Sequence, residues 1–287
     1  MTTLMPPIVE ARNVDFCYAD GTQALRSLNL AFARGRRTAL LGRNGAGKST
    51  LFTLLNGLAR PSRGEVRFAG EPVAYDRRAL RELRRRVGVV FQHPDSQLFS
   101  ASIREDISFG PLNLGLSKDE VRRRVEQALA TVGLAELAER PTHALSYGEK
   151  KRACLAGVLA MEPEVLIFDE PAAGLDPPMT AQLLPLLDDL HAGGRTVIVA
   201  THDVDFAVAW ADEICVLHAG ALTFQGEVAK HEALCRALAE LELGLPVVFE
   251  LFGALRRRGL VRGEEPPRTR AELLARLDEN IVDRSCA

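Results

Sequence analysis

Nine consecutive residues near the start of the chain have the types and spacing of a phosphate-binding loop. The first eight match the pattern G-x-x-x-x-G-K-[ST], and the segment directly follows an apolar run at residues 38–41. Glycines let backbone N–H groups turn toward a phosphate, the lysine reaches the β and γ oxygens, and the serine hydroxyl can bind Mg²⁺. The pattern predicts a nucleotide-binding P-loop formed by Gly42, Arg43, Asn44, Gly45, Ala46, Gly47, Lys48, Ser49 and Thr50.

Two acidic residues follow a second apolar run, at residues 165–168. Asp169 ends this run and Glu170 comes next. Beside a P-loop, Asp169 can hold Mg²⁺, and Glu170 can orient and deprotonate an attacking water. A solvated acidic strand end is the alternative interpretation, and the neighbouring P-loop makes it the weaker one. A carboxylate that acts on water predicts hydrolysis of a nucleoside triphosphate rather than phosphoryl transfer to a metabolite.

The segment Leu-Ser-Tyr-Gly-Glu at residues 145–149 admits two interpretations. Ser146 and Glu149 have the S-x-x-E spacing of a helix capping box, which alone would explain both residues. A serine-capped helix start that contains Gly148 also offers backbone N–H groups and a positive dipole end to an anion. On the second interpretation, this segment binds a phosphate that the chain's own P-loop does not reach.

The elements that position these residues follow from the hydrophobic pattern. Short apolar runs bounded by turn residues predict the central strands of a parallel sheet at residues 38–41, 87–91, 165–168, 196–200 and 213–217. A smaller antiparallel layer is predicted at residues 8–16, 28–32, 66–68 and 221–224. Helical patterns alternate with the apolar runs, so we expect an α/β fold.

Two helical regions are predicted outside this core. A serine-capped helix at residues 117–134 indicates a helical subdomain at about residues 95–160. The tail has helical patterns at residues 232–243, 247–258 and 270–277. We therefore expect a nucleotide-binding domain at residues 1–228 and a C-terminal helical extension at residues 229–287.

Composition excludes several classes of function. The chain has 36 Lys and Arg residues against 38 Asp and Glu residues, so it lacks the strong positive charge that favours sequence-independent binding of nucleic acid. No run of eighteen apolar residues and no signal-peptide pattern is present, which predicts a protein of the cytosol. Reduced thiols are predicted at the five dispersed cysteines, which are Cys17, Cys154, Cys215, Cys235 and Cys286.

Taken in order, the motifs resemble those of the ATP-binding-cassette (ABC) ATPases over residues 8–228. The resemblance identifies Tyr18 as the aromatic that stacks on adenine, Gln92 as the Q-loop glutamine and His202 as the switch histidine. It also identifies residues 145–149 as the signature motif and residues 174–176 as the D-loop. The family's usual Leu-Ser-Gly-Gly-Gln is Leu-Ser-Tyr-Gly-Glu here, so Tyr147 and Glu149 depart from the pattern.

The resemblance implies a head-to-tail dimer that binds ATP and Mg²⁺ between its two chains. One chain supplies its P-loop, and the partner supplies Ser146, Gly148 and Asp176. Lys48, Gln92, Glu170 and His202 would be catalytic, and Ser49, Gln92 and Asp169 would hold Mg²⁺. Because ATP contacts both chains, the closed dimer would form with ATP and open after hydrolysis. A homodimer is the simpler assembly, and pairing with a related ATPase stays open.

Within the family, residues 93–99 and 103–115 resemble those of energy-coupling-factor (ECF) importers, and the tail length resembles the cobalt-type subunit. The resemblance implies a peripheral protein on the cytoplasmic face of the cell membrane. About residues 93–116 would receive a transmembrane T component, and a substrate-binding membrane subunit would be contacted only indirectly. Nickel or a vitamin is an alternative solute, since the solute never touches this chain.

Other classes of protein fit less well. A soluble ABC ATPase without a transport role usually has a long coiled-coil insertion or two cassettes, and this chain has neither. A P-loop GTPase would carry an Asn-Lys-x-Asp motif, which is absent from the sequence. In such a GTPase or in a small-molecule kinase, the Leu-Ser-Tyr-Gly-Glu segment would also have no role.

Overall fold

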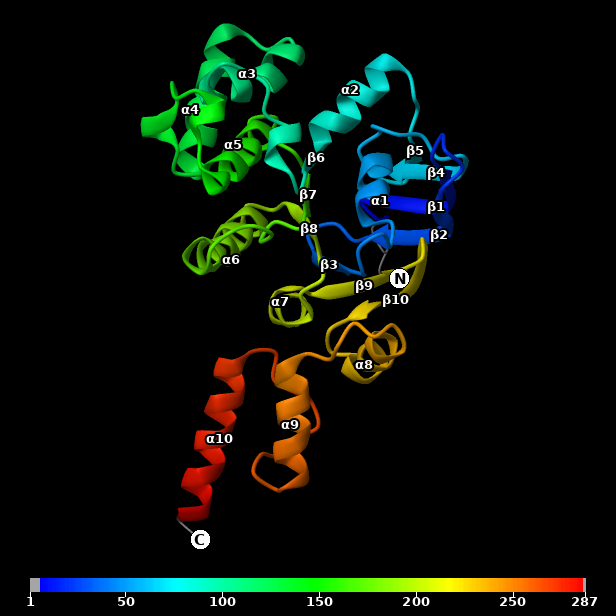
Figure 1. Ribbon diagram of the computed structural model, residues 1–287, viewed down its shortest axis with the longest axis vertical. Helices are drawn as coiled ribbons and strands as arrows, with labels where there is room; N and C mark the ends of the chain where they lie inside the picture. The colour runs from blue at the N-terminus through cyan, green and yellow to red at the C-terminus, as the bar shows by residue number, and fades with distance from the viewer. Residues whose placement is uncertain (1–5, 286–287) are drawn as a thin grey trace.

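A six-stranded sheet runs through the centre of the protein (Figure 1). The computed structural model describes residues 6–285, and the strand order in this sheet is β10-β9-β3-β8-β7-β6. Every neighbouring pair is parallel except β10 with β9. The strands are β3 (Arg37–Leu41), β6 (Val87–Val90), β7 (Val165–Asp169), β8 (Thr196–Thr201), β9 (Glu213–His218) and β10 (Ala221–Glu227). The five central strands predicted from the apolar runs are thus confirmed.

A four-stranded antiparallel sheet forms the second layer, with strand order β2-β1-β4-β5. Its strands are β1 (Val9–Cys17), β2 (Gln23–Phe32), β4 (Arg63–Phe68) and β5 (Glu71–Pro72). Leu40 of the central sheet faces this layer and α1 (Lys48–Leu55), whereas Ala39 and Leu41 face the opposite core. Because side chains alternate along a strand, a strand buried on both faces is apolar at every position.

The prediction that residues 221–224 belong to the smaller layer is wrong. These residues lie in β10, which pairs with β9 of the central sheet. Ala219 and Gly220 join the two strands with φ values of 46° and 80°. This tight reversal folds the chain directly back onto β9, so the nearest free edge is the one β10 occupies.

Helices cover the other face and one end of the central sheet. Residues 103–159 contain α3 (Ile103–Asn113), α4 (Lys118–Thr131) and α5 (Tyr147–Leu159). Each begins after a serine whose side chain accepts a backbone N–H of the first turn, at Ser102, Ser117 and Ser146. These caps satisfy N–H groups that a helix start leaves unpaired, which is why the serines mark the starts. The remaining elements before the tail are α2 (Arg77–Arg86), α6 (Pro177–Ala192), α7 (Val204–Trp210), η1 (Pro94–Ser96), η2 (Ala135–Leu137) and η3 (Thr142–Ala144).

The tail forms α8 (His231–Glu240), α9 (Val247–Arg257) and α10 (Arg270–Ser285). In Figure 1, α9 and α10 lie side by side and extend away from the sheets. The third helix is longer than the predicted 270–277, because residues 278–285 contain no glycine or proline to end it. Within residues 6–285, every helix is too short or too polar to cross a lipid bilayer.

The four cysteines within the described residues are free thiols. They are Cys17, Cys154, Cys215 and Cys235, whereas Cys286 lies outside the described residues. Burial raises the pKa of Cys154 to about 12, so this thiol stays protonated and packs as a small apolar group.

Candidate active site

The P-loop turns from the end of β3 into α1. Gly45 and Gly47 have φ values of 81° and 102°, a left-handed conformation that glycine adopts at little cost. A Cβ on Gly42 would lie 2.6 Å from the carbonyl oxygen of Leu217, so only glycine fits where the loop passes β9. The loop ends at the start of α1, where unpaired backbone N–H groups and the helix dipole favour an anion.

Polar side chains from the P-loop and from the end of β7 meet at this point. The Nζ of Lys48 donates to the Gly42 carbonyl at 2.6 Å and lies 3.4 Å from Oε1 of Glu170. The Ser49 hydroxyl donates to Oδ2 of Asp169 at 2.5 Å. Burial raises the pKa of Asp169, while the Ser49 hydrogen bond and the Lys48 charge oppose that rise. The two motifs, more than a hundred residues apart in sequence, therefore form one site.

Glu170 is held in a sparsely populated backbone conformation between two functional groups. Its φ is 48°, and its N–H donates to the Ala200 carbonyl at 3.0 Å. Oε2 lies 3.0 Å from Nδ1 of His202, while Oε1 is buried, accepts no hydrogen bond from the described residues and lies 3.4 Å from Nζ of Lys48. Such a conformation persists only where surrounding contacts fix it. His202 and Lys48 thus orient the carboxylate, and Oε1 can still accept a hydrogen bond or a proton.

A cavity of about 400 Å³ adjoins these groups. Tyr18 lies on its wall, and the Tyr18 hydroxyl is 2.7 Å from Oγ1 of Thr50. The predicted residues that line the cavity are Tyr18, Arg43, Asn44, Gly45, Ala46, Gly47, Lys48, Ser49, Thr50, Gln92, Asp169 and Glu170. Gly42 reaches the site through its carbonyl, and His202 reaches it through Glu170. One chain therefore brings together all the residues predicted to act in cis.

The residues predicted to act in the partner's site do not line this cavity. Ser146 accepts the Glu149 N–H at 3.3 Å, and the Glu149 carboxylate accepts the Ser146 N–H at 2.7 Å, so the predicted capping box is present. Asp176 caps α6 by accepting the Met179 N–H at 2.8 Å. A Cβ on Gly148 would lie 2.3 Å from Sδ of Met179. Each of these residues thus has a structural role within its own chain.

Sequence reasoning missed two groups of residues near the site. Thr22, Gln23 and Ala24, at the start of β2, line the cavity, and nothing in their types indicates it. The carbonyl of Ala24 would lie 2.8 Å from a Cβ on Gly47, so this strand sets the position of the loop. Lys151 is a buried lysine that contacts the turn after Glu170. The sequence feature that could have indicated Lys151 is its charge next to the apolar run that begins at Ala153.

The oxygen donors at the site suit Mg²⁺, a hard cation that prefers oxygen ligands. The Ser49 hydroxyl and the Asp169 carboxylate lie together beside the P-loop, and the Glu170 carboxylate lines the same cavity. Ser49 and Asp169 would hold the ion, with Gln92 on the same wall. Bound there with the nucleotide, Mg²⁺ neutralises charge on the phosphate oxygens.

The same residues are matched by a known family. A family profile described as "ABC transporter" matches residues 25–173, more than half of the chain. The chain belongs to the ATP-binding subunits of ABC transporters. It is 50% identical over 271 residues to a putative ABC transporter ATP-binding protein of Streptomyces coelicolor, covering 94% of this chain and 95% of that one.

Further relatives place the chain among the ECF-type ATPases. It is 45% identical over 251 residues to the energy-coupling factor transporter ATP-binding protein EcfA of Methanocaldococcus jannaschii, covering 88% of this chain and 90% of that one. The structure is similar to that of cbiO1 from Clostridium perfringens, part of the ABC transporter complex cbiONQ. The TM-score is 0.72 at 43% identity, covering 86% of this chain and 99% of that one.

A dimeric structure of another ATP-binding cassette, in a post-hydrolysis state with ADP and Pi, is also similar to this ATPase. Its TM-score is 0.70 at 27% identity, covering 77% of this chain and 98% of that one. The chain is therefore an ATP-hydrolysing ECF subunit with the P-loop fold predicted from its sequence. ABC ATPases bind ATP with Mg²⁺, which confirms the predicted substrate and cofactor.

Proposed function

We propose that this ECF-type ATPase drives the import of cobalt ions. The similarity to cbiO1, at 43% identity and over nearly the whole length of that chain, carries this proposal. The cobalt-type resemblance of the tail agrees with it. Nickel and vitamin import remain the alternatives, because the ATPase chemistry would be the same for each solute.

The geometry supports a specific division of roles. Glu170 is the general base for the attacking water, since its carboxylate is oriented by His202 at 3.0 Å and by Lys48 at 3.4 Å, and Oε1 accepts no hydrogen bond within the described residues. Lys48 stabilises charge on the γ-phosphate. Gln92 acts at the same cavity wall, next to the loop toward the membrane partner. Tyr18 contacts the adenine, because it lies on the wall of the P-loop cavity and is 47% exposed.

The assembly is a head-to-tail dimer with two composite sites. Within one chain, Ser146 is exposed and lies outside its own nucleotide cavity, which leaves the helix start free to face a second chain. A capped helix start binds a phosphate through its N–H groups and dipole. Ser146, Gly148 and Asp176 would then complete the partner's ATP site. With all the hydrolytic residues present in this chain, a homodimer has two working sites.

The partner in the membrane is a transmembrane T component that docks on residues 93–116. This segment exposes Phe99, Phe109 and Leu112, and the two phenylalanine rings pack edge to face with centroids 4.8 Å apart. Adjacent exposed apolar residues are typical of a surface that binds another protein. Docking there places the ATPase on the cytoplasmic face of the membrane, with the solute-binding subunit reached only through the T component.

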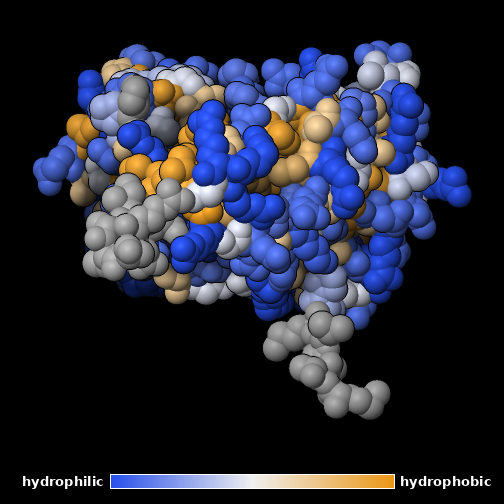
Figure 2. Space-filling view, turned by 90° about the horizontal axis from the view of Figure 1, so that it is seen from below, coloured by the Kyte–Doolittle hydropathy of each residue, from blue (hydrophilic) through white to orange (hydrophobic). Residues whose placement is uncertain are grey.

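The C-terminal extension is a second dimer contact. Figure 2, seen from the end where the tail lies, shows apolar residues in orange among a mostly hydrophilic surface. Val247, Leu251 and Leu274 of α9 and α10 are each about half exposed, at 52%, 50% and 48%. Pairing two tails would bury these side chains, at roughly 25 cal/mol for each Å² of apolar surface removed from water.

Purification from membranes tests the proposal. The tagged chain would be isolated with ATP present, its bound subunits identified, and transport measured with cobalt, nickel and a vitamin mixture. Co-isolation with small membrane subunits and ATP-dependent uptake of cobalt alone would support it. Uptake of nickel or a vitamin would keep the ECF role and replace the solute. A chain that stays monomeric and binds no membrane subunit would favour a role outside transport.

A further inference from the structure

Tyr147 stands where the family's Leu-Ser-Gly-Gly-Gln pattern has its first glycine, and its side chain contacts two segments outside α5. The hydroxyl donates to the backbone carbonyl of Gln92 at 3.1 Å. The ring packs on Gly174, where an added Cβ would lie 2.7 Å from Cε1 of Tyr147. The first residue of α5 therefore contacts both the Gln92 loop and the turn that follows Glu170.

Lys151 lies one turn further along α5, on the same face as Tyr147. Its Nζ donates to three backbone carbonyls, at 3.2 Å to Glu170, 2.8 Å to Pro171 and 2.5 Å to Ala173. The same ammonium lies 5.3 Å from the centroid of the Tyr147 ring, within cation–π range. Lys151 is only 8% exposed. These carbonyls replace the water that a buried ammonium loses.

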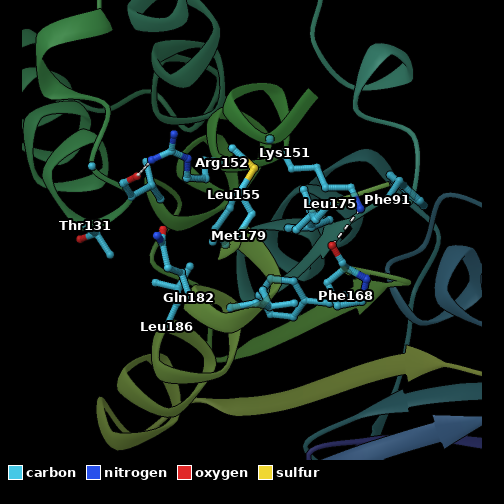
Figure 3. Close-up of a pocket in the computed structure, with 16 residues that line it drawn as sticks. Phe91, Thr131, Lys151, Arg152, Leu155, Phe168, Leu175, Met179, Gln182 and Leu186 are labelled. Carbon is cyan, nitrogen blue, oxygen red and sulfur yellow. Dashed lines mark hydrogen bonds between the residues drawn. The ribbon is translucent and has the colours of Figure 1, made fainter. Parts of the chain in front are cut away.

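A cavity beside Lys151 makes its hydrogen bonds important for holding α5 in place. Lys151 lines a cavity of about 480 Å³ whose apolar wall includes Leu155, Phe168 and Met179 (Figure 3). Because this space separates part of α5 from α6, direct packing between the two helices is incomplete there. Burial lowers the pKa of Lys151 to about 8. The negative charge of Glu170 opposes this fall in the pKa.

We propose that Tyr147 and Lys151 are positioning residues that link the two composite sites of the dimer. They join the start of α5 to the Gln92 loop and to residues 170–173 of the same chain. When that helix start binds the γ-phosphate in one site, the pair fixes Glu170 in the other. This inference rests on the head-to-tail dimer proposed above.

A short series of contacts connects the start of α5 with the side chain of Glu170. Ser146 and Gly148 lie at the start of α5, and Lys151 follows within the same helix. The carbonyl of Glu170 accepts from Lys151, while the side chain of Glu170 contacts Lys48 and His202. Since the backbone of Glu170 is held at a φ of 48° by its contacts, a loss of the Lys151 hydrogen bonds frees it to relax.

The main test replaces Lys151 and a matched lysine on the same helix. Lys151→Met removes the three hydrogen bonds, whereas Lys150→Met removes an ion pair with Asp95 at the surface. We expect Lys151→Met to lower kcat about 10-fold to 100-fold, as a misplaced catalytic group does. The KM and the Kd for ATP, the latter from calorimetry, stay within about twofold, because the P-loop is intact. The Lys150→Met variant keeps the wild-type kcat within about twofold.

Two milder variants keep the test decisive if Lys151→Met does not fold. Tyr147→Phe removes one hydroxyl and is expected to lower kcat about threefold, in line with one neutral hydrogen bond. Lys151→Arg keeps the charge and the donors and is expected to retain more activity than Lys151→Met, or about a third of the wild-type kcat. Cooperativity in ATP, measured as the Hill coefficient, falls toward 1 when the pair is broken.

The results for these variants distinguish a failure of the coupling role from a failure of the proposed dimer. A wild-type kcat in both Lys151→Met and Tyr147→Phe would overturn the inference. A parallel loss of kcat and ATP affinity would also overturn it, because it would indicate general damage to the fold. Ser146→Ala tests the composite site alone. If that variant is impaired while the Lys151 variants are active, the dimer stands and only the coupling is wrong.

Discussion

The two halves of the proposed ATP site differ in how much of each is built within a single chain. On the P-loop side, Lys48, Ser49, Asp169 and Glu170 contact one another at 2.5–3.4 Å around a formed cavity. On the α5 side, the capped start of the helix is exposed and lines no nucleotide cavity of its own chain. One chain by itself forms the first half, whereas in the proposed dimer the second half would receive its ligand from a neighbouring chain.

The difference suggests a nucleotide switch in which one half is formed within the chain and the other half depends on a second chain. The P-loop half rests on β3 and β7, whose residues are buried except for Arg37 at the start of β3. The α5 half is joined to the sheet by the links from Tyr147 and Lys151, beside a cavity of about 480 Å³. In the proposed dimer, nucleotide bound at the start of α5 would act on the P-loop half of the same chain through these links.

Glu170→Gln tests the chemistry of the P-loop half and has the largest expected effect. The amide keeps the shape but accepts no proton, so we expect kcat to fall about 10²-fold to 10⁴-fold. ATP binding persists, and the ATP-bound dimer accumulates because it cannot hydrolyse its ligand. Phosphate release and light scattering with ATP measure the two effects. Hydrolysis at the wild-type rate would remove Glu170 from the role of base.

Lys48→Ala tests the binding of phosphate by the same half. The change removes a buried ammonium that lies 3.4 Å from Glu170. We expect the Kd for ATP to rise about 100-fold, the size of effect seen when a buried charged contact loses one partner. Calorimetry with ATP measures the change, and Lys118→Ala on the surface of α4 serves as the control. A variant that binds ATP as tightly as the wild type would contradict the P-loop assignment.

A mixture of two inactive variants tests whether the halves come from different chains. Lys48→Ala removes one half and Ser146→Ala the other. In a head-to-tail heterodimer of the two, one site contains both changes and the other contains neither. Because one of the two sites in each mixed dimer is intact, mixing is expected to restore up to about half of the wild-type ATPase rate per mixed dimer. No recovery in a mixture shown to form heterodimers would indicate that each chain completes its own site.

A tail variant gives the smallest expected effect and separates dimer contact from catalysis. Leu251 is 50% exposed on α9, so Leu251→Asp costs little in the free chain but places a charge in the proposed contact. We expect about tenfold weaker dimerisation, or about 1.4 kcal/mol, by sedimentation. The melting temperature of the ATP-free chain is expected to shift by no more than about 2 °C. Unchanged dimerisation would remove the tail from the interface.

Sequence reasoning was most successful where a motif and its supporting element are adjacent in the chain. The P-loop between β3 and α1 and the serine caps of α4 and α5 depend on local backbone chemistry, so their residue types identify them. Sequence reasoning failed for β10, because its sequence pattern resembles that of the strands in the antiparallel layer. The tight reversal at residues 218–221 determines which sheet β10 joins. The residues of a strand do not by themselves identify the strand that it pairs with.

By itself the sequence determined the nucleotide chemistry, because phosphate binding, a metal-binding carboxylate and a base require particular residue types at fixed spacings. Only the tertiary structure decided that one carboxylate oxygen of Glu170 faces Lys48 and the other faces His202. It also decided that Tyr147 and Lys151 reach the Gln92 loop and the turn beyond Glu170. These relations join segments far apart in the chain. Their distances depend on how the sheet and helices pack, which no local pattern encodes.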